Sequence, residues 1–337
     1  MPGRRVALLA VAGALLLGDL SSSSAWHDTP PPRRIRGVDA HDGTVYRDGA
    51  TYYMVGTSYR CGFRWRPGGD PSNFCGFSVY QSHDGRAWRF VRRLFEPWGW
   101  NDWAGGTWQE LCAGAGDGCF NPRMVRRSDG VWILAFNAPY DFRVREANAY
   151  YFMGCNGPAG PCGREAGPPF GSTVKPRMQI CYGNGDFTIV DVGGGEAWIY
   201  CTRQDQTLSA EKLDVWWTNG VGVGSHELAG VEEVESPGVA LFNGRWILTF
   251  SQPNCGYCDG TTIGYATRRG SQPWRYQGLL SLHSCGGQAR TLFWLDGHLW
   301  QWIDDWDSTA DDQGDAPVIF AAMGDDDLGL PLLACPL

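Results

Sequence analysis

The sequence predicts an all-β protein, a five-bladed β-propeller made of four-stranded antiparallel sheets. Five segments share one pattern, in which an apolar stretch leads through a Gly-containing turn to a strand rich in aromatic residues. Further strand-like stretches follow these hairpins, and long helical periodicity is absent beyond the N-terminal region. Five similar units fit a radial arrangement around a central channel. A β-sandwich is the alternative, but it does not explain five similar hairpins.

Asp-Gly or Asn-Gly between two apolar runs is the strongest short-range signal of a β-hairpin. This signal occurs four times, and a run of three glycines replaces it in the third segment: Asp48-Gly49, Asp129-Gly130, Gly193 to Gly195, Asn243-Gly244 and Asp296-Gly297. The repeats are therefore expected to begin near residues 38, 120, 185, 234 and 287.

The first residues have the composition of a secretory signal peptide. Arg4 and Arg5 precede an apolar run that ends at Leu17, and small residues follow as far as Ala25. The apolar run is too short to span a bilayer comfortably. We therefore expect a signal peptide at 1–25, a Pro-rich linker at 26–36, the propeller at 37–337, and a secreted, extracellular protein.

Cysteine content agrees with an oxidising compartment, because the count of twelve is even. Close spacing suggests loop-stapling pairs, and two wider pairs would bridge a strand pair and tie down the C-terminal tail: Cys61/Cys75, Cys112/Cys119, Cys155/Cys162, Cys255/Cys258, then Cys181/Cys201 and Cys285/Cys335. A zinc site at Cys255 and Cys258 is the alternative, although no second CxxC or HxxxH follows.

Each repeat carries a polar residue shortly before its hairpin, where the first strand of a blade lines the channel. These residues are Asp42, Asn121, Asp186, Glu235 and Gln288. The last four lie at one offset from their turns, and Asp42 lies two residues nearer, which keeps the same strand face. A strand start that faces a packed core would be Val, Ile or Leu. We expect all five to face one cavity; the alternative is that they are solvated turn residues.

The chain resembles glycoside hydrolase family 43 from about residue 37 to 335. The segment 37–43 with Asp48-Gly49 is similar to the opening blade of that family, 185–190 to its third-blade motif, and Glu235-Ser236-Pro237 to its fourth-blade motif. Thr207-Leu208 and Leu213 follow as in its exo-β-1,3-galactanase-like branch. This resemblance implies that Asp42 is the general base, Glu235 the general acid, and Asp186 the carboxylate that orients and tunes the acid.

The chain departs from the family at three positions. The usual Asp-Pro is Asp42-Gly43 here, and His41 precedes it. The galactanase-like branch has Ala-His-Gly there, and a fifth-blade Gln is proposed as its base, so Gln288 is an alternative to Asp42 for positioning the water. A second-blade Glu of that branch corresponds to Asn121. His41 is expected to contact substrate, to orient Asp42 or to be structural.

These residue types suit glycoside hydrolysis with inversion. One protonated carboxyl must act on the leaving oxygen, and one carboxylate must hold a water on the opposite face of the sugar. A third carboxylate raises the pKa of the acid by repulsion. The resemblance implies arabinose-, galactose- or xylose-containing polysaccharides. A retaining fructan-type hydrolase, with Asp42 as nucleophile, and a non-catalytic carbohydrate-binding propeller remain alternatives.

Aromatic and amphipathic side chains are expected to bind the sugar. The candidates are Tyr59, Arg290, Trp98, Trp100, Trp103, Trp108, Trp302 and Trp306, of which Tyr59, Trp100, Trp306 and Arg290 are the main predictions. Packing between blades is the alternative for each Trp.

The expected partner is a polysaccharide or oligosaccharide bound by a monomer. A net charge of −8 argues against nucleic acid and against an anionic membrane, because both require basic clusters. No cofactor is expected to be required. Three acidic runs offer oxygen ligands for Ca²⁺ but lack the spacing of a calcium loop, so we expect solvated turns at Asp304-Asp305, Asp311-Asp312 and Asp325 to Asp327.

Overall fold

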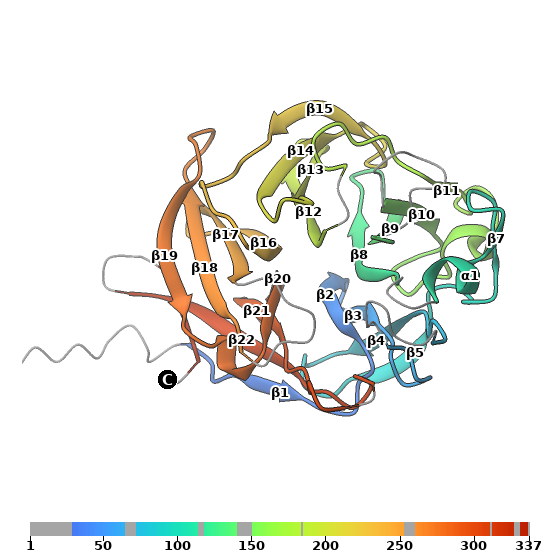
Figure 1. Cartoon of the computed structure of the whole chain (residues 1–337), viewed down its shortest axis with the longest axis horizontal. Helices are drawn as coiled ribbons and strands as arrows, with labels where there is room; N and C mark the ends of the chain where they lie inside the picture. Colours follow the sequence, from blue (N-terminus) through green and yellow to red (C-terminus); the bar gives the residue numbers. More distant parts are fainter. Residues whose placement is uncertain are drawn as a thin grey trace, which may run out of the picture.

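The computed structural model describes residues 29–64, 72–113, 118–139, 150–182, 185–252, 260–310, 312–326 and 331–335. These residues form five sheets arranged radially around a central axis (Figure 1). The predicted five-bladed β-propeller is confirmed, and the inner strands start close to the expected repeat boundaries. The expected signal peptide at 1–25 lies outside the described residues.

The first four blades are antiparallel sheets in which strand order follows chain order, and the first strand lies nearest the axis (Figure 1). Blade one contains β2 (His41–Asp48), β3 (Thr51–Thr57), β4 (Phe77–Ser82) and β5 (Arg89–Arg93). Blade two contains β8 (Phe120–Arg126), β9 (Trp132–Asn137), β10 (Tyr150–Cys155) and β11 (Thr173–Val174). Blade three contains β12 (Phe187–Gly193), β13 (Glu196–Thr202), β14 (Leu208–Leu213) and β15 (Gly220–Ser225). Blade four contains β16 (Glu235–Phe242), β17 (Arg245–Gln252), β18 (Thr262–Arg268) and β19 (Arg275–Ser281).

Blade five is assembled from both ends of the chain. Strands β20 (Gln288–Leu295), β21 (His298–Asp304) and β22 (Val318–Asp325) pair in order, and β1 (Arg33–Ile35) adds the outer strand to β22. A short strand β23 (Pro331–Leu333) also pairs with β22. Residues 33–35 were expected to belong to a linker, but they are part of the propeller sheet, and Ile35 pairs with Val318.

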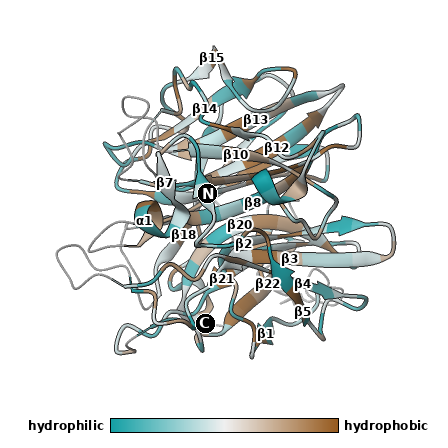
Figure 2. Ribbon diagram, turned by 90° about the vertical axis from the view of Figure 1, so that its right-hand side faces the viewer, coloured by the Kyte–Doolittle hydropathy of each residue, from teal (hydrophilic) through white to brown (hydrophobic). Residues whose placement is uncertain are grey.

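Hydrophobic packing occurs mainly between neighbouring blades. Each of the five blade interfaces has its own buried cluster, for example Val55 and Phe77 against Phe136 between blades one and two. Figure 2 shows brown, hydrophobic stretches within the strands of the body. Because the apolar side chains are used between the sheets, the ends of the inner strands are available for polar groups.

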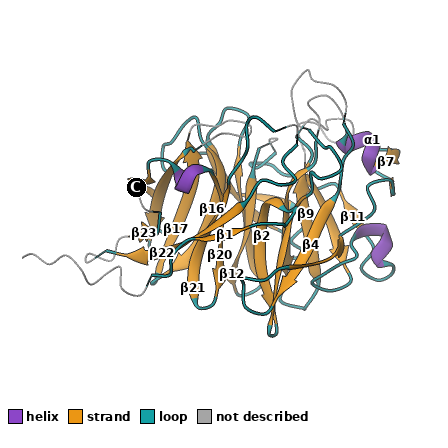
Figure 3. Cartoon of the chain, turned by 90° about the horizontal axis from the view of Figure 1, so that it is seen from below, coloured by secondary structure: helices purple, strands orange, loops and turns teal. Residues whose placement is uncertain are grey.

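Connections at the outer rim of blades one and two carry the described helix α1 (Trp108–Cys112) and the hairpin β6 (Trp100–Asn101) and β7 (Gly106–Thr107). Thr107 and Glu110 form a capping box at the start of α1. Short 3₁₀ turns lie at η1 (Gly163–Ala166) and η2 (Ser284–Gly286). In Figure 3 the strands run side by side between two faces made of loops, and α1 lies at the edge. No helix in the described ranges is long and apolar enough to cross a membrane.

Five of the six predicted disulfides are confirmed. They link Cys61–Cys75, Cys112–Cys119, Cys155–Cys162, Cys181–Cys201 and Cys285–Cys335. The predicted sixth pair, Cys255 and Cys258, lies outside the described residues, as does its zinc alternative.

Candidate active site

The inner strands begin with irregular pairing that directs polar side chains towards the axis. Register shifts interrupt the first residues of β2, β8, β16 and β20. Asp42, Asn121 and Ser236 lie in three of these bulges with φ of 46°, 56° and 59°. Asp and Asn tolerate this left-handed conformation better than most residues. A bulge re-aims its side chain, so each strand turns a polar group into the site.

Pairing with the second strand of each blade shows that the polar residues do not all occupy the same register position on their inner strands. His41 pairs with Thr57, Glu235 with Ser251, and Gln288 with Asp304. Asp42 therefore lies one residue later than the position that Glu235 and Gln288 occupy. Asn121 is likewise one residue later, since Phe120 pairs with Asn137. The expected equal offset is wrong in this detail.

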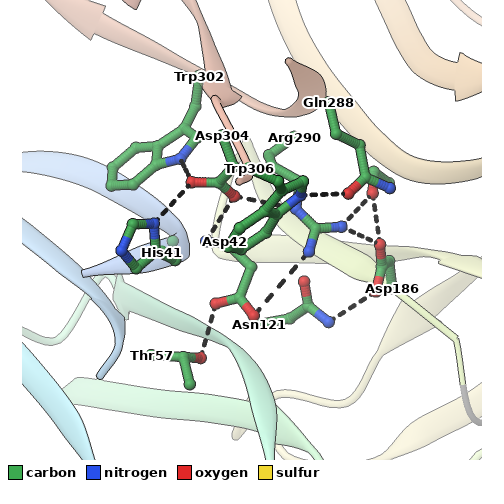
Figure 4. Close-up of polar contacts among 12 residues, drawn as sticks. His41, Asp42, Thr57, Asn121, Asp186, Gln288, Arg290, Trp302, Asp304 and Trp306 are labelled. Atoms are coloured by element: carbon green, nitrogen blue, oxygen red, sulfur yellow. Dashed lines mark hydrogen bonds and ion pairs between the residues drawn. The ribbon is translucent and has the colours of Figure 1, made fainter. Parts of the chain in front are cut away.

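Arg290 is the centre of the site (Figure 4). Its Nη1 donates to Asp186 Oδ2 at 2.5 Å, its Nε donates to Asp304 Oδ2 at 3.2 Å, and its Nη2 lies 3.9 Å from Asp42 Oδ2. The side chain is 7% exposed. Burial lowers the pKa of Arg290, but the surrounding carboxylates outweigh it, and the pKa lies above its ordinary value. One guanidinium thus holds carboxylates from three blades together.

Asp304 is a site residue that the sequence analysis missed. It was expected in a solvated turn, but it ends β21 and is fully buried. Its carboxylate accepts from the Asp42 backbone N–H at 2.8 Å and from Trp302 Nε1 at 2.9 Å, and His41 Nδ1 lies 3.5 Å away. Burial raises the pKa of Asp304, but His41, Arg290 and Trp302 outweigh it and keep the pKa below its ordinary value.

Asp42 is almost sealed from solvent, at 1% exposure. Thr57 Oγ1 donates to its Oδ1 at 2.6 Å, while its Oδ2 accepts no hydrogen bond. Burial raises the pKa of Asp42 to about 7, and Asp304 adds to the rise, against the opposing charge of Arg290. Arg123, also buried, donates to the Asp42 carbonyl at 2.5 Å. Burial lowers the pKa of Arg123 to about 10.

Asp186 joins blades two, three, four and five. Asn121 Nδ2 donates to its Oδ1 at 2.7 Å, and Ser236 and Arg290 donate to its Oδ2. Its side chain is 15% exposed, so it reaches the open end of the site. The serine that follows Glu235 is thereby tied to the carboxylate of the preceding blade.

Glu235 and Gln288 form the next contact along the ring. Gln288 donates its amide N–H to Glu235 Oε1, and Trp306 donates its indole N–H to Gln288 Oε1 at 2.7 Å. Glu235 is partly exposed, whereas Gln288 is 2% exposed. These contacts unite Asp42, Asn121, Asp186, Glu235, Gln288 and Arg290 in one site.

His41, Tyr59 and Trp306 form an aromatic wall beside this network. The His41 ring lies 5.3 Å from Trp306 and 5.5 Å from Tyr59, centroid to centroid. All three are at most 4% exposed, so they support the site from behind.

The structure does not bring Trp100 to the inner strands. Trp100 lies on β6, which pairs with β7 at the outer rim of the molecule (Figure 1). Trp108 and Trp302 are buried between blades, which agrees with the packing alternative for both. Trp98 is 66% exposed. Within the described ranges, no group of three or more His, Cys, Asp or Glu side chains could hold a metal ion.

Comparison with known proteins identifies the architecture. No protein-family model matches the chain, and no curated protein matches its sequence. Among solved structures, it matches an exo-β-1,3-galactanase from Phanerochaete chrysosporium bound to β-1,3-galactotriose, with TM-score 0.66 and 15% identity over 90% of this chain and 67% of that chain. The fold is that of family 43 glycoside hydrolases.

Two further matches agree on this fold. A putative exo-β-1,3-galactanase from Bifidobacterium bifidum aligns with TM-score 0.66 and 17% identity over 89% of this chain and 96% of that chain. An exo-β-1,3-galactanase from Clostridium thermocellum aligns with TM-score 0.64 and 14% identity over 89% and 64%. The chain spans about two thirds of the length of the larger family 43 structures.

Proposed function

We propose that the protein is a secreted glycoside hydrolase that cleaves arabinose-, galactose- or xylose-containing polysaccharides with inversion. The observation that carries the proposal is the convergence of Asp42, Asp186 and Glu235, from three blades, on Arg290 and its neighbour Gln288. These residues are far apart in the chain, so local structure alone does not explain why they lie together. The structural similarity to exo-β-1,3-galactanases makes β-1,3-galactan the first polymer to test.

Glu235 is the proposed general acid. Gln288 donates to its Oε1 and orients the carboxyl group, whose partial exposure lets it carry a proton towards the substrate. As the bond between the anomeric carbon and the glycosidic oxygen breaks, that proton moves to the oxygen, and the leaving sugar departs as an alcohol. Asp186 holds Ser236, and with it the backbone that carries Glu235.

Asp42 is the proposed base. Water attacks the anomeric carbon from the face opposite the leaving group and gives a proton to the Asp42 carboxylate. A pKa of about 7 suits this role, because the group is partly ionised at neutral pH and readily accepts a proton. Its Oδ2, without a hydrogen bond, is the atom that would receive the proton. In this structure Asp42 is buried, so side chains above it must move to admit the water.

Three measurements test the proposal. Reducing-sugar release from β-1,3-galactan, arabinan and xylan should identify a substrate, and Glu235→Gln should lower kcat by roughly a thousandfold with sugar affinity retained. The exposed Glu232→Gln is the matched control and should leave kcat unchanged. Retained activity in Glu235→Gln would exclude the acid assignment, and binding without any hydrolysis would favour a non-catalytic propeller. Proton NMR of the first-formed anomer reports inversion or retention.

A further inference from the structure

A second pocket, the lateral pocket, lies on the flank of blade two. It has a volume of about 330 Å³ and contains none of the inner-strand residues described above. Its lining includes Phe95, Trp100, Asp102, Trp103, Arg164 and Glu165. These residues come from the segment around the β6–β7 hairpin and from η1, both of which belong to the connections of the outer rim (Figures 1 and 3). The volume is at the lower end of the range of small-ligand sites.

Two indole rings give the lateral pocket a stacking surface. Trp100 is 48% exposed, although a large aromatic side chain is stabilised by burial. Trp103 donates its Nε1 to the Thr173 carbonyl at 2.8 Å, which fixes the plane of its ring. A rigid indole with an exposed face suits a ligand that is apolar on one side and polar at its edge. A pyranose ring has this form, with C–H groups on its faces and hydroxyls around them.

Charged groups stand beside the indoles. Asp102, Arg164 and Glu165 are exposed and line the same pocket. Glu165 Oε1 accepts the Glu96 backbone N–H at 2.6 Å, which orients a carboxylate that has capacity for further donors. Hydroxyls can donate to the carboxylates and accept from the guanidinium. Two carboxylates against one guanidinium disfavour an anionic ligand, so the chemistry selects a neutral glycan.

The pocket walls are held before any ligand arrives. The disulfide Cys155–Cys162 fixes one side of the pocket, because Cys162 lines it. The Cys162 backbone N–H donates to the Leu94 carbonyl at 2.7 Å, which joins the two connecting segments. A preformed site loses less conformational freedom on binding.

We propose that the lateral pocket binds one or two sugar units of a neutral polysaccharide and holds the polymer on the flank of the enzyme. The ligand class rests on the proposed function. The pocket itself is separate from the inner-strand site and takes no part in bond cleavage.

Affinity electrophoresis tests the lateral pocket with polymer cast in the gel. Three proteins are compared in β-1,3-galactan, arabinan and xylan, each carrying Glu235→Gln so that the polymer stays intact: the parent, Trp100→Ala and Trp98→Ala. Trp98 is the matched control, because it is more exposed than Trp100 but does not line the pocket. Loss of one stacking platform should raise the Kd for the retained polymer at least about tenfold in Trp100→Ala and leave it unchanged in Trp98→Ala. Circular dichroism checks that all three are folded.

Several results would overturn the proposal. The first is equal retention of the parent and Trp100→Ala in every polymer. The second is an equal loss of polymer affinity in Trp100→Ala and Trp98→Ala. The third is no retention of the parent by any polymer. Wild-type hydrolysis is measured separately on the same polymers. If a polymer is cleaved by the wild type but retains the parent and Trp100→Ala equally, sugar binding in the lateral pocket is refuted and the proposed function stands. If no polymer is cleaved, the proposed function is refuted.

Discussion

The indole N–H of Trp306 donates to Gln288 Oε1 at 2.7 Å and thereby decides which way the Gln288 amide faces. Indole is only a donor, so the amide oxygen must point to Trp306 and the amide nitrogen to Glu235. Glu235 consequently receives at Oε1 a hydrogen bond that fixes the orientation of its carboxyl group. The orientation of the proposed acid thus depends on a buried tryptophan of blade five.

Trp306→Phe should lower kcat while the fold is retained. Phenylalanine keeps a ring against His41 and Tyr59 but removes the donor that orients Gln288. We expect a loss of about tenfold, the size of one misplaced hydrogen bond. Steady-state kinetics on the identified polymer measure the effect, with Trp98→Phe as the exposed control. A change confined to KM would contradict an effect on the acid.

Asp42→Asn should remove the acidic limb of the activity profile. A base with a pKa of about 7 is ionised above that pH, so kcat/KM should rise with pH, reach half its maximum near pH 7 and level off above it in the wild type. Asparagine cannot ionise, so the variant should lose most of its activity at every pH. If Asp42 only supports Arg290, Asp42→Asn will keep the wild-type pH profile at reduced amplitude.

The same group should affect stability with a definite sign. The pKa of Asp42 is higher in the folded state than in the unfolded chain, so between about pH 4 and 7 the folded state binds more protons. The free energy of unfolding therefore falls as pH rises through this window. Asp42→Asn lacks the ionisable group that causes this pH dependence. Its free energy of unfolding relative to wild type should therefore increase from pH 5 to pH 8. Urea unfolding at both values measures the trend, and a constant difference would contradict the raised pKa.

Arg290→Ala should destabilise the protein, because it leaves Asp42, Asp186 and Asp304 without their shared cation. Breaking a buried ion pair on one side costs about 3–5 kcal/mol. The cost should be largest at pH 8 and smaller at pH 4, where the carboxylates take up protons more easily. Arg290→Lys keeps the charge but cannot bridge three carboxylates, so activity should remain low while stability partly recovers. Thermal unfolding at both pH values, with kinetics, separates these effects.

Ile35→Ala tests the closing strand β1. Ile35 is 6% exposed and packs in the cluster between blades five and one. The substitution should cost about 2 kcal/mol of unfolding free energy, since the side chain is buried at a sheet edge. Val223→Ala on the outer strand β15, where Val223 is 54% exposed, is the control and should change stability little. Equal effects of both substitutions would mean that β1 adds no stability.

Much of the fold could be predicted because each hairpin carries its own local signal. Asp-Gly and Asn-Gly turns, and the alternation around them, need no knowledge of distant residues. The polar residues of the inner strands were found for the same reason. Their exact register against the second strands could not be predicted, because a bulge changes the register without a distinct sequence signal around Asp42 or Asn121.

Asp304 was missed because its role depends on contacts across the ring. In the sequence it is the first of two aspartates after an apolar strand, which resembles a solvated turn. A signal was nonetheless present: the second strand of each blade has a buried polar residue at, or one residue before, its end near the site, namely Thr57, Asn137, Thr202, Ser251 and Asp304. Comparing the ends of the second strands, as well as the starts of the first, would have identified it.

The pairing of Ile35 with Val318 also has a consequence during biosynthesis. Strand β1 emerges early but cannot find its partner until blades one to four have been made, so its edge stays unsatisfied throughout translation. Ring completion is therefore a late, long-range event that follows the local hairpins. The Arg290 cluster is likewise long-range, because it joins blade five to blades one and three. A nascent chain interrupted before β22 would lack the partner of β1 and therefore the strand pairing that closes the ring.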